Sequence, residues 1–127
     1  RQKDKIEYKL APAEKIPYSD HFFDVVTMLG VLEHFSVDEA ANLFKQIHRI
    51  LKPQGRLILT TPHPRSARLL KVMAKIALIS PQEIRDLKAC YSARALSSLL
   101  EGGGFHSQKI SSGYFQAGLN TWAYADK

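Results

Sequence analysis

Cysteine is almost absent from this chain of 127 residues, in which Cys90 is the single example. One cysteine cannot form an internal disulfide, so a disulfide-stabilised secreted scaffold is excluded and a reducing, cytoplasmic location is expected. Long apolar runs are also absent: none has the length, about 20 residues, that a membrane-spanning helix needs.

Patterns typical of metal, nucleophile and phosphate sites are missing too. The five histidines show no metal-ligand spacing with cysteine or carboxylate, so no metal site is predicted. Cys90 has no recognisable base and is better explained as packing than as a nucleophile. The Gly102–Gly104 run follows a helical pattern, which indicates a helix cap rather than a phosphate-binding loop.

Acidic residues are scarcer than basic ones, with 12 Asp and Glu against 18 Lys and Arg and a net charge of +6. Such an excess can attract nucleic acid, an anionic membrane or an anionic substrate. The cations are scattered, and no aromatic residues are interleaved with a basic stripe as single-strand binders require. Nucleic-acid binding is therefore the weakest hypothesis, and a solvated basic surface is favoured.

What the chain does contain is an ordinary globular composition, with 45% hydrophobic and 24% charged residues. Its length suits one domain, so residues 1–127 are interpreted as a single unit. The sequence begins at Arg1 without an initiator methionine, which raises the hypothesis that it is a piece of a longer protein.

The middle of the chain alternates strand, helix and strand. The apolar run Phe23–Leu29 predicts a strand covered on both faces. Ser36 and Glu39 form a capping box before a helix that Pro53 ends. The run Arg56–Thr61 predicts the next strand, parallel to the first and joined to it by a right-handed crossover.

The remaining elements are predicted on either side of this unit. A short strand is expected at Ile6–Leu10, ahead of a loop. Helices are expected over 66–79, after the capping box at 80–83, and after Ser92. Two strands, 109–115 and 121–125, are expected to close the chain.

Polar residues follow the two central strands where each one ends. Gly30, Glu33 and His34 come after the first strand, and His63 comes after the second. Ligands of open parallel sheets bind at the carboxyl ends of strands, and glycine lets a ligand approach the backbone closely. Glu33 and His34 could instead satisfy amides of the next helix, but their position favours a role in a site.

Three segments together resemble the C-terminal half of a class I S-adenosylmethionine-dependent methyltransferase: AEKIPYSDHFFDVVTMLGVLEHF, LFKQIHRILKPQGRLILTTP and YSARALSSLLEGGGF. The resemblance covers most of the chain in the family's order. It implies an α/β fold, the C-terminal part of a Rossmann-like sheet with helices on both faces and an antiparallel C-terminal strand pair. The family's first strand, Gly-rich loop and the acidic residue ending strand 2 have no counterpart, so the domain is interpreted as partial.

The resemblance also implies S-adenosylmethionine as the cofactor and assigns candidate site residues. Cofactor contacts fall on five positions: Ala13, Glu14, Leu29, Gly30 and Val31. Pro12 stands where the family commonly has an acidic residue for the adenine, which puts that contact in doubt. Glu33 and His34 are the candidates for a catalytic base or for orienting the acceptor. Residues 63–90 fall where the family inserts a lid or a substrate-binding element.

The function that follows is methyl transfer to a small-molecule acceptor, with this chain supplying only the C-terminal half of the site. A faint similarity of the C-terminal tail to methyltransferases of bacterial surface polysaccharides suggests a glycan or lipid-linked acceptor. The 127-residue chain alone is expected to be inactive. The alternative is a non-catalytic remnant or assembly module that pairs with a partner chain.

The resemblance makes Ile6–Leu10 the family's strand 3 and Phe23–Leu29 its strand 4. The family places strands 1 and 2 between these two, so their absence would leave Phe23–Leu29 as an apolar edge. Three alternatives are predicted for the pairing of this edge. Residues upstream of Arg1 could pair with it, another chain in a homo-oligomer or complex could do so, or the Ile6–Leu10 strand could relocate beside it.

The helix predicted over 66–79 is amphipathic. Its cations Arg68, Lys71 and Lys75 lie along one side, and the other side carries Leu69, Leu70, Met73, Ile76 and Ala77. Such a helix could rest on a membrane surface. A lid helix that packs on the sheet, with its basic residues in solvent, is the favoured interpretation.

Overall fold

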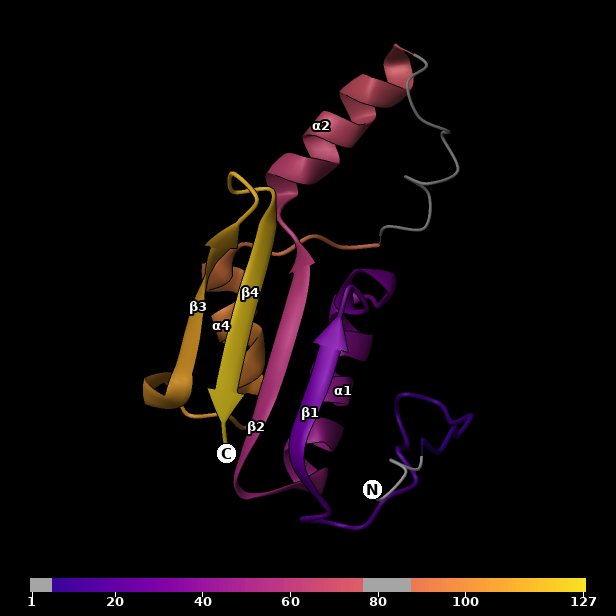
Figure 1. The fold of residues 1–127 in the computed structure, drawn as a ribbon, viewed down its shortest axis with the longest axis vertical. Coiled ribbons are helices and arrows are strands. Elements are labelled where there is room, and N and C mark those ends of the chain that lie inside the picture. The colour runs from indigo at the N-terminus through magenta and orange to yellow at the C-terminus, as the bar shows by residue number, and fades with distance from the viewer. Residues whose placement is uncertain (1–5, 77–87) are drawn as a thin grey trace, which may run out of the picture.

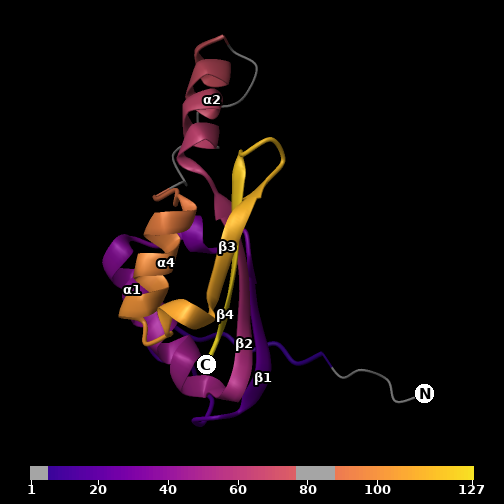
Figure 2. The same ribbon diagram turned by 90° about the vertical axis from the view of Figure 1, so that its left-hand side faces the viewer.

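The computed structural model describes residues 6–76 and 88–127. Its centre is a four-stranded sheet in the order β1-β2-β4-β3, in which β1 and β2 are parallel and the other neighbours antiparallel. Figures 1 and 2 show α1 and α4 on one face of this sheet. The elements are β1 (Phe23–Leu29), η1 (Leu32–His34), α1 (Val37–Ile50), β2 (Leu51–Pro62), α2 (Pro64–Lys75), α4 (Ala93–Gly102), η2 (Ser107–Lys109), β3 (Ile110–Phe115) and β4 (Asn120–Asp126).

The β1-α1-β2 unit confirms the predicted parallel strand pair with its crossover helix. Ser36 Oγ accepts from the Glu39 amide at 3.4 Å, and the Glu39 carboxylate accepts from the Ser36 amide at 2.7 Å, so the capping box forms. The helix ends at Ile50, earlier than predicted, because Leu51 is already extended and pairs with Phe23. The strand β2 therefore begins five residues before the predicted Arg56, with a register shift near its start.

The predicted strand at Ile6–Leu10 is wrong. These residues form no strand, and within the described part of the chain β1 pairs only with β2. Ile6, Tyr8 and Leu10 are 75%, 89% and 106% exposed, so they bury too little apolar surface to offset the entropy of ordering a strand. Relocation of this segment beside β1 is therefore excluded as the cover for its edge.

The core lies between the sheet and the two helices on one of its faces. Phe44 of α1, Leu57 and Leu59 of β2, and Leu96 and Leu100 of α4 are all fully buried there. These packed side chains hold the strand ends in place, since protein cores are nearly as dense as organic crystals.

The opposite face of the sheet is open in the described residues, unlike the predicted arrangement with helices on both faces (Figure 2). Val25 and Leu29 of β1 are 51% and 61% exposed, and Ile58 of β2 is 39% exposed. The prediction that β1 is covered on both faces is therefore wrong for the described residues. Trp122 and Tyr124 of β4 lie half-buried on this open face, paired in register with Thr60 and Ile58.

The C-terminal half confirms the predicted helix and strand pair. Ser92 caps α4 by accepting from the Ala95 amide at 3.3 Å. The hairpin β3–β4 turns through Gln116, Ala117 and Gly118, all with positive φ. In this hairpin Gly113 lies under the Trp122 indole, where an added Cβ would come within 2.8 Å of a ring carbon.

The helix α2 extends past the carboxyl ends of the strands and does not pack on the sheet (Figures 1 and 2). None of its residues is buried, so the favoured interpretation of a lid helix packed on the sheet is wrong here. Within the described residues, no helix has both the length and the apolar character needed to cross a bilayer. The helix predicted from the capping box at 80–83 lies outside the described residues.

Candidate functional site at the carboxyl end of the parallel strands

The end of β1 presents accessible backbone and apolar side chains. The Gly30 amide donates to Thr60 O at 3.2 Å, which completes the pairing with β2, and Gly30 then turns the chain with φ +64. Leu29 and Val31 on either side are 61% and 40% exposed. An added Cβ at Gly30 would meet only Glu33 Oε1, at 3.5 Å, so a ligand can reach this turn.

The carboxylate of Glu33 is buried close to this turn. Glu33 is 7% exposed, and within the described residues its Oε2 is buried without a hydrogen-bond partner. A buried acceptor without a donor costs about 1–3 kcal/mol, and more when it is charged. Among the described residues, Thr61 Oγ1 and Tyr91 Oη are unpaired in the same way, and Glu33 is the carboxylate among these three. His34, the next residue, is exposed in the last turn of η1.

The segment that returns from the insert completes the surroundings of Glu33. The Lys88 and Ala89 amides donate to Glu33 O at 2.8 and 3.2 Å, and the Tyr91 amide donates to Pro62 O at 3.2 Å. Residues 88–91 thereby bridge η1 and the end of β2. This bridge brings Cys90 near the Glu33 carboxylate.

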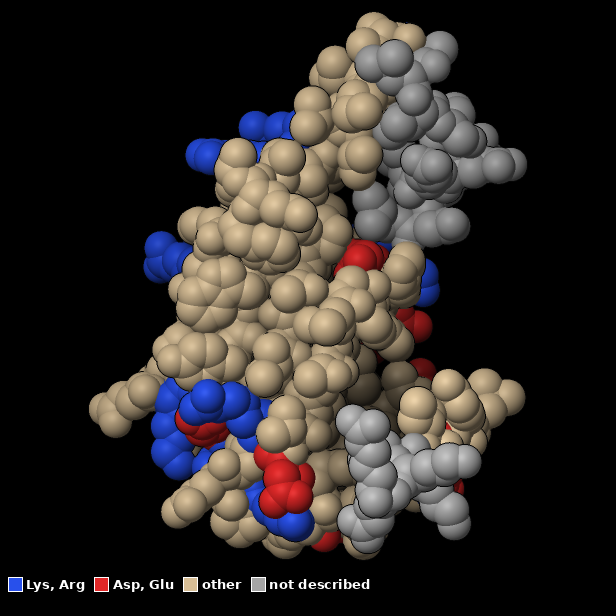
Figure 3. Space-filling view, viewed as in Figure 1, with Lys and Arg blue, Asp and Glu red and all other residues tan. Residues whose placement is uncertain are grey.

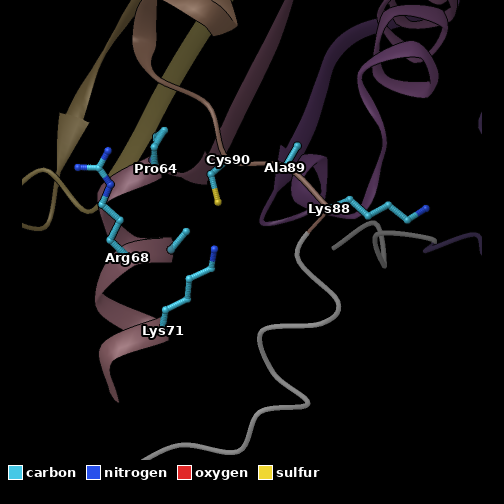
Figure 4. Close-up of a pocket in the computed structure, with 7 residues that line it drawn as sticks. Pro64, Arg68, Lys71, Lys88, Ala89 and Cys90 are labelled. Atoms are coloured by element: carbon cyan, nitrogen blue, oxygen red, sulfur yellow. The ribbon is translucent and has the colours of Figure 1, made fainter. Parts of the chain in front are cut away.

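A hollow of about 350 Å³ lies between α2 and this bridge (Figure 4). In Figure 4 the Lys71 ammonium is directed toward the Cys90 thiol, whereas the head groups of Arg68 and Lys88 extend away from it. The other lining residues are Pro64, Ala67 and Ala89. Three basic side chains thus line the hollow, of which Lys71 is the one directed toward the thiol, and the volume suits a small molecule.

Burial raises the pKa of the Cys90 thiol, and the nearby Glu33 carboxylate raises it further, while Lys71 acts in the opposite direction. A thiol with a raised pKa stays protonated near neutral pH and is a poor nucleophile. Cys90 therefore contributes to the shape of the hollow. Sequence reasoning treated Cys90 only as packing and did not connect it with Lys71, because no spacing in the sequence indicates that the bridge brings them together.

The structure does not bring His63 into the group of residues at the end of β1. Its Nδ1 accepts from the Arg65 amide at 3.1 Å, which caps α2, and its ring packs edge-on against Tyr114 with centroids 5.1 Å apart. His63 thus joins α2 to the β3–β4 hairpin. His63 follows β2 because it is the residue that caps α2.

Ala13 and Glu14 also lie apart from Gly30. They occupy a turn closed by a hydrogen bond from the Lys15 amide to Pro12 O at 3.1 Å. The Arg49 guanidinium ties the following residues to the last turn of α1 by donating to Ile16 O and Tyr18 O. In Figure 1 this loop lies toward the amino end of β1, so the structure groups Leu29, Gly30, Val31 and Glu33 and leaves Ala13 and Glu14 out.

Metal-binding geometry is not found in the described residues, which contain no group of three or more His, Cys, Asp or Glu side chains suited to a metal ion.

Comparison with known proteins supplies the chemical context. A family described as "Methyltransferase domain" matches residues 1–59. The chain is similar to the "Ubiquinone/menaquinone biosynthesis C-methyltransferase UbiE" of Desulfotalea psychrophila, with 26% identity over 116 residues, covering 79% of this chain and 46% of that protein. It is similar to the "Demethylmenaquinone methyltransferase" of Lactobacillus johnsonii, with 30% identity over 116 residues, 80% of this chain and 47% of that protein. The chain therefore spans about half the length of the curated relatives it matches.

Solved structures show the same fold. A SAM-dependent methyltransferase from Thermotoga maritima superposes with a TM-score of 0.68 and 20% identity, over 91% of this chain and 61% of that one. Human N-acetylserotonin methyltransferase in complex with SAM gives a TM-score of 0.66 and 14% identity, over 100% of this chain and 35% of that one. These likenesses confirm the predicted α/β class with a Rossmann-like sheet and an antiparallel strand pair.

Proposed function

We propose that this chain belongs to the class I S-adenosylmethionine-dependent methyltransferases and supplies the C-terminal half of a methyl-transfer site, which the family match over residues 1–59 and the similar methyltransferases support. The acceptor is a small molecule, and the Gly-rich half that holds most of the cofactor in this family comes from outside the chain. A cytoplasmic location accompanies the proposal, supported by the presence of a single cysteine, Cys90, which fits a reducing compartment.

The end of β1 fits the methionine part of S-adenosylmethionine. Leu29 and Val31 offer exposed apolar contacts, and the Gly30 turn has room for a ligand against its backbone. Ala13 and Glu14 would contact the adenine only if their loop moved from the amino end of β1. When bound, the cofactor supplies an activated methyl group on a sulfonium. The chain's own task is to position the acceptor.

The buried Glu33 carboxylate is the single observation that carries the proposal. Its Oε2 lacks a donor in the described residues, and Oε1 faces the Gly30 turn. An acceptor hydroxyl or amine placed against the Gly30 turn would donate to this carboxylate, which would orient the acceptor and receive its proton during transfer. His34, adjacent and exposed, is the second candidate for orienting the acceptor.

The relative from Desulfotalea psychrophila is named for C-methylation in ubiquinone and menaquinone biosynthesis, so a carbon acceptor is the first class to test. A glycan or lipid-linked acceptor is the second, because the C-terminal tail faintly resembles methyltransferases of bacterial surface polysaccharides.

Titration calorimetry with S-adenosylhomocysteine tests the cofactor half of the proposal. On the full reading frame that encodes this chain, we expect binding that Gly30→Ala weakens about tenfold, which corresponds to about 1.4 kcal/mol. The control Gly102→Ala, at the end of α4 with open space around it, should bind like the wild type. Equal affinity of both variants would contradict the assignment of Gly30.

Methyl transfer with a labelled methyl donor tests Glu33, measured on the full reading frame that encodes this chain. Glu33→Gln keeps the shape of the side chain and removes its basicity, so we expect the kcat to fall about 10²- to 10⁴-fold while cofactor affinity is unchanged. The exposed Glu101 on α4 provides the control, as Glu101→Gln should retain full activity. Unchanged kcat in Glu33→Gln would rule out Glu33 as the base.

The alternative function is a non-catalytic module that pairs with a partner chain. It is favoured by the free edge of β1 and by the exposure of Val25, Leu29 and Ile58 on the open face. This alternative predicts association of the chain without any binding of S-adenosylhomocysteine, so the same titration separates the two functions.

A further inference from the structure

The exposed side of α2 carries a row of apolar side chains that the proposed site does not use. Leu69, Val72 and Ile76 recur at helical spacing and are 45%, 56% and 61% exposed. The helix extends beyond the sheet and buries none of its residues in the fold (Figures 1 and 2). Three aliphatic side chains of this size are thus held in solvent on one stripe of an amphipathic helix.

This row points away from the hollow beside Cys90. Of the α2 residues that line the hollow, Pro64, Ala67 and Lys71 form a different row, and Arg68 lies between the two rows. At 3.6 residues per turn, the two rows lie about 140° apart around the helix axis. The apolar row therefore cannot be the wall of the hollow while α2 keeps this position.

The charges of α2 are all positive. Four cations lie on it and its twelve residues include no carboxylate: the cations are Arg65, Arg68, Lys71 and Lys75. Within the described part of the chain, every ion pair involves other cations, so those of α2 are uncompensated. The part of α2 visible in Figure 3 accordingly shows no acidic side chain. Helical geometry places Arg65, Arg68 and Lys75 on the same side of the helix as the apolar row or beside it.

We propose that α2 docks on an anionic lipid surface. Leu69, Val72 and Ile76 would enter the boundary between head groups and acyl chains, while Arg65, Arg68 and Lys75 reach the lipid phosphates. Positive charge near an anionic leaflet adds attraction for each Lys or Arg. The four cations of α2, with no carboxylate among its residues, complement the phosphates of a lipid surface, so a lipid surface fits better than an apolar protein groove.

Vesicle co-sedimentation tests this docking with the intact chain. We expect binding to vesicles that contain phosphatidylglycerol, weak binding to pure phosphatidylcholine, and loss of binding at high salt. Replacing Arg65, Arg68 and Lys75 by Gln should weaken binding about fivefold for each cation. Replacing Leu69, Val72 and Ile76 by Gln should abolish it.

The control carries the same change in net charge elsewhere on the surface. Lys15→Gln, Lys45→Gln and Lys109→Gln alter exposed residues outside α2, and this triple variant should bind like the wild type within about twofold. Equal weakening by both cation triples would overturn the proposal, as would equal binding to both kinds of vesicle. Circular dichroism shows whether each variant keeps its fold, because all the substituted side chains are exposed.

Sedimentation velocity supplies the competing outcome. If the wild-type chain self-associates and the apolar triple variant of α2 does not, the row is covered by a second copy and the lipid proposal is overturned. Cofactor titration of the same variants should be unchanged, since none of the substituted α2 residues lies at the end of β1. Vesicle binding can therefore contradict lipid docking while cofactor titration supports the proposed function, and the reverse is also possible.

Discussion

At the residue scale, the candidate site depends on Gly30 and Glu33, which have different requirements. Gly30 needs a conformation that side chains disfavour, and Glu33 needs a donor that the described residues do not supply. Both residues follow β1 within four positions, which is why the sequence alone could predict them as site residues. That Glu33 is buried and His34 exposed could not be predicted, because this depends on the docking of residues 88–91.

Gly30→Ala should destabilise the chain by about 1–2 kcal/mol, since an alanine at φ +64 adopts the left-handed conformation. Urea unfolding measures the change. Gly102→Ala lies at the end of α4 and should be neutral or stabilise by up to about 1 kcal/mol. If the two variants unfold at the same urea concentration, the backbone strain assigned to Gly30 is absent.

His48 should make stability depend on pH. Burial lowers its pKa below the ordinary value of 6.5, and the positive charges of Lys127, His106 and His21 lower it further. The unfolded chain then binds more protons than the folded chain, so the free energy of unfolding falls as the pH drops through about 6.5 and levels off below the lowered pKa.

Unfolding in urea at several pH values measures this effect. His48→Gln should show a smaller loss of stability below pH 6.5 than the wild type, because one histidine with a lowered pKa has been removed. An identical pH profile in the two proteins would exclude His48 as a source of the dependence.

At the element scale, local signals determined most of what could be predicted. The capping box at Ser36 and the cap at Ser92 begin α1 and α4 as predicted, because a cap is formed by residues next to each other in the chain. The strand at Ile6–Leu10 failed because alternation shows only that a segment could be a strand. A strand also needs a partner, and none is available there within the described residues.

Ser36→Ala should destabilise the chain by about 1 kcal/mol, since the Glu39 amide loses its acceptor at the start of α1. Thermal unfolding measures the loss. Ser98→Ala, an exposed serine inside α4, is the matched control and should be neutral or slightly stabilising. A melting temperature that falls equally in both variants would show that the loss does not come from the cap.

At the scale of the whole molecule, the two faces of the sheet differ, because helices cover one of them and the other is open in the described residues. α1 and α4 cover one side of the sheet, while the other side and the edge of β1 stay open in the described residues. The sequence predicted this edge through the family's strand order. It did not predict the open face, since an apolar strand looks the same whether or not its cover belongs to the same chain.

Val25→Lys should reduce self-association of the chain. A lysine on an exposed edge strand opposes pairing with another chain, whereas the wild-type edge of β1 invites it. Sedimentation velocity at increasing concentration measures the effect. Val37→Lys, at the start of α1 with a similar exposure of 57% against 51%, should associate like the wild type. Association that is equally strong in the two variants would place the contact away from β1.

The single tryptophan of the chain lies on that open face, over Gly113 and stacked on Tyr124. Its indole is half-buried, so its emission responds to whatever excludes water from the face. A chain that gains a cover there, whether upstream residues or a partner, will report the event as a blue shift of its own fluorescence. The fluorescence of Trp122 therefore measures whether the open face of the sheet has been covered, without any added label.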